Sequence, residues 1–170
     1  MLGWLRRRWA VVGSVGLVVL IGVSLVLLWP ERTAPPRERE YGAFTACLLT
    51  DDRGLAGEGA KAAWDGMQKA SLSTLAKTQY LAVNGPQTPA NAAAYFNALG
   101  LQKCQMIIAV GAGPVGATAA GRSRFPEARY LVVGESSDSG LPGVSDVSAA
   151  TITSAVEKEM TAAVDRRDGS

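Results

Sequence analysis

A buried strand followed by an amphipathic helix, within residues 43–75, constrains the fold of this chain more than any other stretch. The strand, residues 43–50, is apolar along nearly its whole length, as expected of a central parallel strand covered on both faces. A polar turn at residues 51–57 leads into a helix with one stripe at helical spacing. The stripe consists of Ala60, Ala63, Trp64, Met67, Ser71 and Leu75. Strand, turn and helix together predict the first half of a βαβ unit.

Strands and helices then alternate to residue 164. Further strands are predicted at residues 77–83, 105–110, 129–133 and 144–149. Helices are predicted at residues 89–99, 114–122 and 151–164. Thr88 is a good cap for the first of these helices, and Gly100 a good terminator. This alternation predicts an α/β fold, a three-layer parallel sheet with helices on both faces and right-handed crossovers.

An uncharged run at residues 9–29 precedes the α/β region and is long enough to cross a bilayer as a helix. Tryptophans at both of its ends suit the two membrane interfaces, and the basic flank, residues 1–8, should stay in the cytoplasm. A cleaved signal peptide is the alternative, but its apolar core usually spans only about 7–15 residues and ends at an A-x-A site, which is missing here. We therefore predict an uncleaved single-pass anchor in the cell membrane, with an extracytoplasmic C-terminal domain.

The region after the anchor divides into a linker, one domain and a short tail. Residues 30–41 hold three prolines and alternating charges, which predicts an extended tether. Residues 42–166 form the predicted domain and residues 167–170 a tail. A chain of 170 residues with 48 % hydrophobic content has room for one modest core beside a membrane segment.

Charge and composition exclude several functions. The chain has 17 Lys plus Arg against 15 Asp plus Glu, and three of the positive residues, Arg6, Arg7 and Arg8, belong to the membrane flank. The nearly neutral remainder gives no electrostatic sign of nucleic-acid binding. No histidine is present, which excludes histidine bases and histidine metal ligands. We predict no catalytic residues, no metal site and no cofactor.

Three segments resemble the N-terminal lobe of the basic membrane protein family, the nucleoside-binding substrate-binding proteins of ABC transporters. They are TDDRGLAGEGAKAAWDGM at residues 50–67, IIAVG at 107–111 and ARYLVVG at 128–134. Ala63, Trp64, Asp65 and Gly66 match the helix signature of that family closely. The resemblance covers residues 44–149 and implies one lobe of a type I periplasmic binding protein, with a role in solute binding.

Two departures from the family pattern change this expectation. The family's ligand residues on the first turn and helix, an Asp, a Phe and an Asn, fall near Ala56, Gly59 and Ala60. Family members also close two lobes around a ligand, whereas this chain holds about one, which would leave a small solute half exposed. We therefore expect a non-catalytic binding or interaction module. The face formed by the C-terminal ends of its strands would contact a partner protein or a second copy of the chain. A small-molecule solute is the alternative ligand.

A glycine motif supports an alternative from another class. Gly111-Ala-Gly113-Pro-Val-Gly116 follows a predicted strand and precedes a helix, and Glu135 ends the next strand. This pattern matches the dinucleotide fingerprint, in which glycines admit a pyrophosphate and an acid holds a ribose hydroxyl. The alternative is an oxidoreductase domain that binds FAD or NAD. A tight structural turn under a helix explains the same glycines.

Four residues are candidates for ligand contact at the ends of two strands. Open α/β sheets bind ligands at the carboxyl ends of their strands. Asp51 and Asp52 end the first strand, and Gly111 and Ala112 end the third, so all four meet if these strands are neighbours. No nucleophile accompanies the two acids, and a capped, solvated turn also explains them.

Cys47 and Cys104 are the only cysteines, and the predicted topology places both in an oxidising compartment. A bond between them would close a long loop and add on the order of 4 kcal/mol to stability. Counting back from the two strand ends predicts an axial offset of about 10 Å, beyond disulfide reach unless Cys104 bends in before its strand starts. The sequence leaves two states open, a disulfide or two buried thiols.

Overall fold

A computed structural model describes residues 41–134, 140–144 and 148–169 of the chain. All of them belong to one compact unit, Glu40–Ser170. The predicted basic flank, the predicted membrane helix at 9–29 and nearly all of the predicted linker lie outside the described residues. In the part that is described, no helix is both long enough and apolar enough to cross a bilayer.

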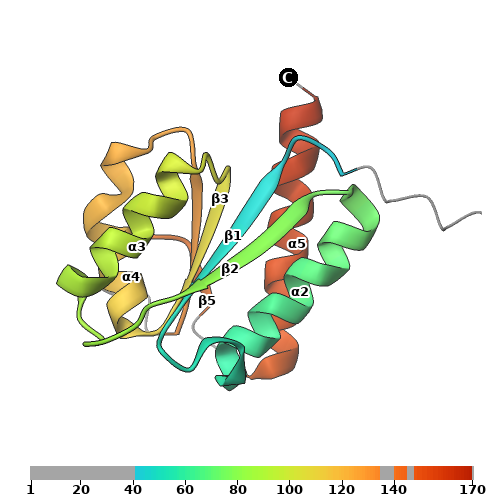
Figure 1. Ribbon diagram of the computed structural model, residues 1–170. Helices are drawn as coiled ribbons and strands as arrows, with labels where there is room; N and C mark the ends of the chain where they lie inside the picture. The colour runs from blue at the N-terminus through green and yellow to red at the C-terminus, as the bar shows by residue number, and fades with distance from the viewer. Residues whose placement is uncertain (1–40, 135–139, 145–147, 170) are drawn as a thin grey trace, which may run out of the picture. The chain divides into compact units, whose positions relative to one another are not determined.

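The centre of the domain is a five-stranded parallel sheet, in the order β2-β1-β3-β4-β5 (Figure 1). Its strands are β1 (Thr45–Thr50), β2 (Lys77–Ala82), β3 (Met106–Val110), β4 (Arg129–Val133) and β5 (Gly143–Val144). The register places Thr45 beside Lys77, and Met106 beside both Ala46 and Arg129. The predicted parallel α/β fold is confirmed.

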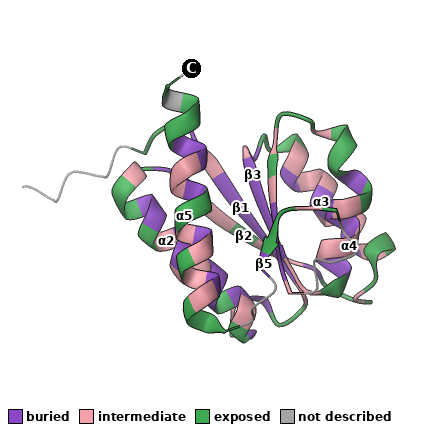
Figure 2. Ribbon diagram, turned by 180° about the vertical axis from the view of Figure 1, so that it is seen from behind, coloured by how far each residue is buried: buried purple, intermediate pink, exposed green. Residues whose placement is uncertain are grey.

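Helices cover both faces of this sheet (Figures 1 and 2). On one face α2 (Glu58–Thr74) lies beside α5 (Ala149–Asp168), and on the other α3 (Pro89–Leu101) lies beside α4 (Ala112–Gly121). Short 3₁₀ turns, η1 (Gly54–Ala56) and η2 (Arg122–Arg124), precede α2 and follow α4. The predicted cap of α3 is present, since the Thr88 hydroxyl accepts a hydrogen bond from the Asn91 amide.

Strand β1 is buried on both sides, which explains its apolar sequence. Ala46 and Leu48 pack in one hydrophobic cluster with residues of α2 and α5. Cys47 and Leu49 pack in a second cluster with residues of α3 and α4. Because successive side chains of a strand point to opposite faces, this single strand joins the two cores.

Helix α2 buries a wider face than the sequence stripe predicts. Ala60, Ala63, Met67 and Ser71 are buried as expected, and Ala62, Gly66 and Ala70 are buried as well. The extra face packs on α5, where the Thr153 hydroxyl donates a hydrogen bond to the Ala62 carbonyl at 2.9 Å. Leu75, placed in the predicted stripe, instead ends the helix in a left-handed conformation and is exposed.

Several predicted boundaries are wrong, and α5 is longer at both ends than the predicted helix at residues 151–164. Helix α3 continues past Gly100 to Leu101. Gly100 does not terminate the helix, and glycine is needed there because a side chain would clash with the Phe125 ring. Helix α4 begins at Ala112, directly after β3. The predicted strand at 144–149 is β5, which ends at Val144, and the Ser148 hydroxyl caps α5 by accepting from the Thr151 amide. Residues 145–147 lie outside the described residues.

Candidate functional site

The carboxyl ends of β1 and β3 meet at the point where the strand order reverses. Strand β2 lies on one side of this central pair and β4 on the other. In open parallel sheets the crevice at such a switch point is the usual ligand site. The expectation that the first and third strands are neighbours is confirmed, and Asp51 and Gly111 follow them directly.

Asp51 and Gly111 lie against each other across this switch point. A methyl group built on Gly111 would lie 3.4 Å from Cβ of Asp51 and 3.6 Å from its Oδ2. Gly111 has a φ of 98°, a left-handed value that favours glycine, and it caps the start of α4. The chain therefore needs glycine here for its backbone, and the absent side chain leaves room beside the Asp51 carboxylate.

The Asp51 carboxylate is already engaged within its own turn. Oδ1 accepts from the Arg53 amide at 3.1 Å, and Oδ2 accepts from Nε at 3.1 Å and Nη2 at 2.8 Å of the same arginine. The side-chain hydrogen bonding to Asp51, together with the negative charge of Asp51, raises the pKa of the Arg53 guanidinium above its ordinary value. The arrangement is a turn stabilised by its own ion pair.

Asp52 and Ala112 are exposed at the same edge of the sheet. Asp52 adds a smaller contribution to the raised pKa of Arg53, which places its charge near that guanidinium. The structure thus brings all four predicted contact residues to one edge, with Asp51 and Gly111 in direct proximity. We call Asp51, Asp52, Gly111 and Ala112, together with the exposed Arg53 and Ala56, the carboxyl edge.

The second and third glycines of the fingerprint pack against the segment that leads into α3. A methyl group on Gly113 would lie 3.0 Å from the carbonyl carbon of Gln87, and one on Gly116 would lie 2.6 Å from Cγ of Pro89. In dinucleotide folds the second glycine admits the pyrophosphate. Here the residues before α3 occupy the space beside it. Glu135, the predicted ribose partner, lies outside the described residues.

The positions that correspond to the family's ligand residues provide little for a ligand. Ala60 is buried in the core, and Gly59 faces Val110, whose Cγ1 would lie 3.4 Å from an added methyl group. Only Ala56 is exposed. An amide side chain at Ala60 would therefore meet the core, whereas a side chain at the half-buried Gly59 would begin in ordinary contact with Val110.

Cys47 and Cys104 form a disulfide, with their Cα atoms 5.9 Å apart. The predicted offset is present in the register, because Cys47 lies beside Ile107. Cys104 reaches back because it precedes β3, where Lys103 has a left-handed φ of 59° and bends the chain. The Gln79 amide donates to the Cys47 sulfur at 3.1 Å. The alternative of two free thiols is wrong.

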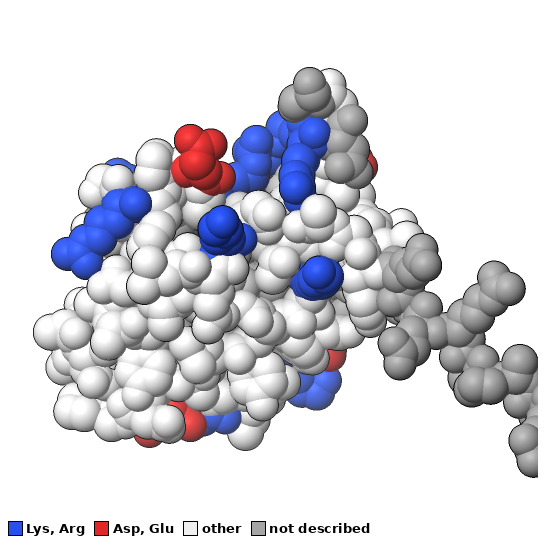
Figure 3. Space-filling model, turned by 45° about the horizontal axis from the view of Figure 1, so that its top comes forward, with Lys and Arg blue, Asp and Glu red and all other residues white. Residues whose placement is uncertain are grey.

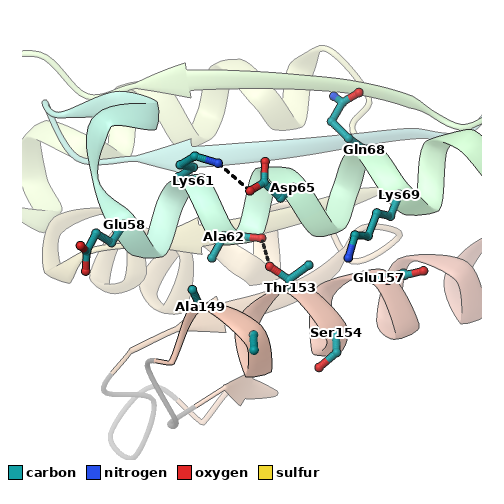
Figure 4. A pocket seen from close by; sticks show the side chains of 11 residues that line it. Glu58, Lys61, Ala62, Asp65, Gln68, Lys69, Ala149, Thr153, Ser154 and Glu157 are labelled. Carbon is teal, nitrogen blue, oxygen red and sulfur yellow. Dashed lines mark hydrogen bonds and ion pairs between the residues drawn. The ribbon is translucent and has the colours of Figure 1, made fainter.

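A groove of about 800 Å³ runs between α2 and α5 from their N-terminal ends (Figure 4), and no carboxyl-edge residue lines it. Its polar lining includes Glu58, Lys61, Asp65, Lys69, Thr153 and Glu157. Lys61 and Asp65 form an ion pair at 2.7 Å. The polar positions of α2 recur at helical spacing in the sequence, but the sequence did not show that α5 would form the second wall. Within the described residues, no group of three His, Cys, Asp or Glu side chains is arranged to hold a metal.

Comparison with known proteins establishes the fold alone. No protein-family model and no curated protein matches the chain. A solved crystal structure, a fragment provisionally named as a lipoprotein of Peptoclostridium difficile 630, superposes with a TM-score of 0.56 at 14 % identity. The match covers 72 % of this chain and 98 % of that fragment. At this identity the likeness concerns the arrangement of strands and helices.

Proposed function

We propose that this chain is a membrane-anchored, extracytoplasmic α/β module that binds a partner protein, or a second copy of itself, through its carboxyl edge and performs no catalysis. The supporting observation is the switch point, where Asp51 and Gly111 adjoin in a setting that has ligand-site topology without catalytic chemistry. The membrane location rests on the uncharged run at residues 9–29. The fold likeness to a protein named as a lipoprotein agrees with this location.

A binding role without catalysis has local support. The Asp51 carboxylate is held by three hydrogen bonds from Arg53, and its neighbours Gly111 and Ala112 have no reactive group. The exposed residues around it, Asp52, Arg53 and Ala56, offer a mixed polar and apolar surface. Such a surface suits a protein partner better than a small ligand, which needs to be enclosed.

Relationship to the basic membrane protein family is part of this proposal. The Ala-Trp-Asp-Gly signature lies on α2 and the sheet has the form of a single lobe, while the nucleoside contacts are replaced by Ala56, Gly59 and Ala60. In two-lobed relatives the equivalent edge faces a partner lobe. We infer that here another protein surface covers it.

The test introduces charge at the carboxyl edge. Ala56→Glu and Ala112→Glu place a carboxylate at exposed positions, where burial against a partner would cost several kcal/mol. Matched controls are Ala94→Glu and Ala120→Glu, which are also at exposed positions, on α3 and α4. Cross-linking of the full chain in membranes should give a product with the parent and both controls and lose it with both edge variants.

Two results would contradict the proposal. One is a parent that yields no cross-linked product or a product unchanged in the edge variants. The other is tight one-to-one binding of a nucleoside, which would make the domain a minimal solute receptor.

The dinucleotide alternative has one favourable observation, since the glycine motif does lie between a strand and a helix. It predicts a coloured protein with stoichiometric flavin, or NAD binding that Gly113→Ala abolishes. We expect neither, because Gly113 and Gly116 pack against Gln87 and Pro89. Absorbance spectra and a dinucleotide titration distinguish the two functions.

A further inference from the structure

The edge of the sheet at which the strands begin carries exposed basic side chains from separate elements. Lys77 begins β2, Lys103 precedes β3, Arg129 begins β4, and Arg167 lies in the last turn of α5. We call these four residues the basic edge. Figure 3, which tilts this end toward the viewer, shows Lys and Arg spread across it. It is opposite the carboxyl edge, because all five strands are parallel.

The register shows how the charges are spaced. Lys77 lies beside Thr45, and one residue further on Ala46, Met106 and Arg129 lie in one row. Lys77 and Arg129 are therefore separated by three strand spacings, about 14 Å. Lys77 lies on the side of the sheet that α3 and α4 cover, and Arg129 on the side that α2 and α5 cover, as their partners Thr45 and Met106 do. The charges therefore spread around the end of the sheet and do not line a pocket for one small anion.

Neighbouring acids offset the charge of this surface only in part (Figure 3). The ion pairs recorded among the described residues, Arg53 with Asp51 and Lys61 with Asp65, lie elsewhere. The acids on adjoining segments are Glu127, Glu159 and Asp165, and all three are exposed. Glu159 lines a shallow hollow together with Arg129, so four basic side chains against three acids leave a small positive excess.

Helix stability explains only part of the pattern. A cation in the last turn of a helix favours the helix dipole, which accounts for Arg167. Lys77 and Arg129 are the first residues of strands, so this effect does not explain them.

The described chain enters the domain at the basic edge. The Gly42 amide donates to the Leu75 carbonyl at 2.8 Å, and Tyr41 lines a shallow hollow together with Lys77. Residues 30–40, which connect this point to the predicted membrane helix, extend to at most about 40 Å. The tether therefore keeps the basic edge within reach of the bilayer surface.

We propose that the basic edge binds the anionic head groups of phospholipids in the membrane that residues 9–29 cross. This inference rests on the proposed anchor. Each Lys or Arg near an anionic surface multiplies the ratio of docked to undocked domain roughly fivefold. A docked domain holds its carboxyl edge away from the bilayer, where a partner can reach it.

The test uses the full chain, one copy per nanodisc, with an acceptor dye on lipid head groups. The donor dye is attached to a cysteine introduced by Leu101→Cys, near the basic edge and 76 % exposed, or by Ala56→Cys at the carboxyl edge. The native disulfide leaves no other thiol among the described residues. With phosphatidylglycerol present, energy transfer from position 101 should exceed transfer from position 56. Pure phosphatidylcholine or high salt should remove the difference.

Charge variants identify the surface. A triple variant should lower the ratio of docked to undocked domain about 100-fold. It combines Lys77→Gln, Lys103→Gln and Arg129→Gln. A control triple variant changes the net charge by the same amount at exposed lysines elsewhere, and it should behave as the parent does. It combines Lys61→Gln, Lys69→Gln and Lys158→Gln.

The outcomes separate the anchor from the docking. Extraction of the protein from membranes by alkaline carbonate would overturn the anchor. Retention in membranes, with equal transfer from both dye positions in anionic nanodiscs, would overturn the lipid site alone. A difference that appears only with two copies per disc would instead assign the basic edge to self-association.

Discussion

Replacing Gly66 by alanine tests whether α2 and α5 pack as closely as the structure has them. A methyl group at this position would lie 2.5 Å from the Thr153 carbonyl oxygen and 3.0 Å from Cβ of Val156. The Thr153 oxygen is a backbone atom of α5, and Cβ of Val156 is bonded directly to that backbone. Neither atom can move aside alone, so the two helices must separate. Overpacking of this kind costs about 1–3 kcal/mol.

Two smaller effects nearly cancel. Separation stretches the hydrogen bond from the Thr153 hydroxyl to the Ala62 carbonyl, which is worth about 1 kcal/mol. Alanine in place of glycine favours a helix by about 1 kcal/mol. The expected net loss for Gly66→Ala is therefore about 1–3 kcal/mol in the free energy of unfolding.

Gly59→Ala is the matched control in the same helix. Its methyl group would lie 3.4 Å from Cγ1 of Val110, an ordinary contact, so stability should stay the same or rise slightly. Urea unfolding of fragment 40–170, followed by far-ultraviolet circular dichroism, gives both values. Equal unfolding free energies for the two variants would refute the close packing of α2 on α5.

Three further predictions concern other parts of the domain. Replacing both Cys47 and Cys104 by serine should lower the unfolding free energy by about 4 kcal/mol, measured by urea titration, because the bond closes a loop with a sequence separation of 57. Burial raises the pKa of Tyr130 above its ordinary 10.0, so the unfolded state loses its proton first and stability should fall as pH rises through 10. Tyr130→Phe should make that fall shallower in unfolding curves taken below and above this pH. Thr88→Ala removes the cap of α3 and should cost about 1 kcal/mol, whereas Thr88→Ser should cost little in the same titration.

The sequence predicts the fold well because the decisive signals are local. The apolar run of β1 and the stripe of α2 each reflect burial of that segment alone. Asp51 and Gly111 could be placed together because both end strands that a parallel sheet brings to one edge. These inferences need only periodicity and the general topology of α/β sheets.

The features that sequence reasoning missed depend on pairs of distant segments. The second wall of the α2 groove is α5, and no pattern within α2 indicates its partner. Gly100, predicted to terminate α3, lies inside the helix and makes room for Phe125, a residue distant in the sequence. The disulfide forms because Lys103 adopts a left-handed conformation and bends the chain before β3. The predicted offset assumed ideal strand geometry, which contains no such bend.

The disulfide also affects how the domain would respond to a mechanical pull from the proposed membrane anchor. Tension enters at Tyr41 and runs into β1, which pairs with β2 and β3 on its two sides. At Cys47 the load passes through a covalent bond to Cys104, so peeling of the strand stops there while the bond is intact. The end of β1 at Leu49 and Thr50, and the turn at Asp51, then stay paired with β2 and β3. A partner held at the carboxyl edge would thus remain attached while the membrane and that partner move apart.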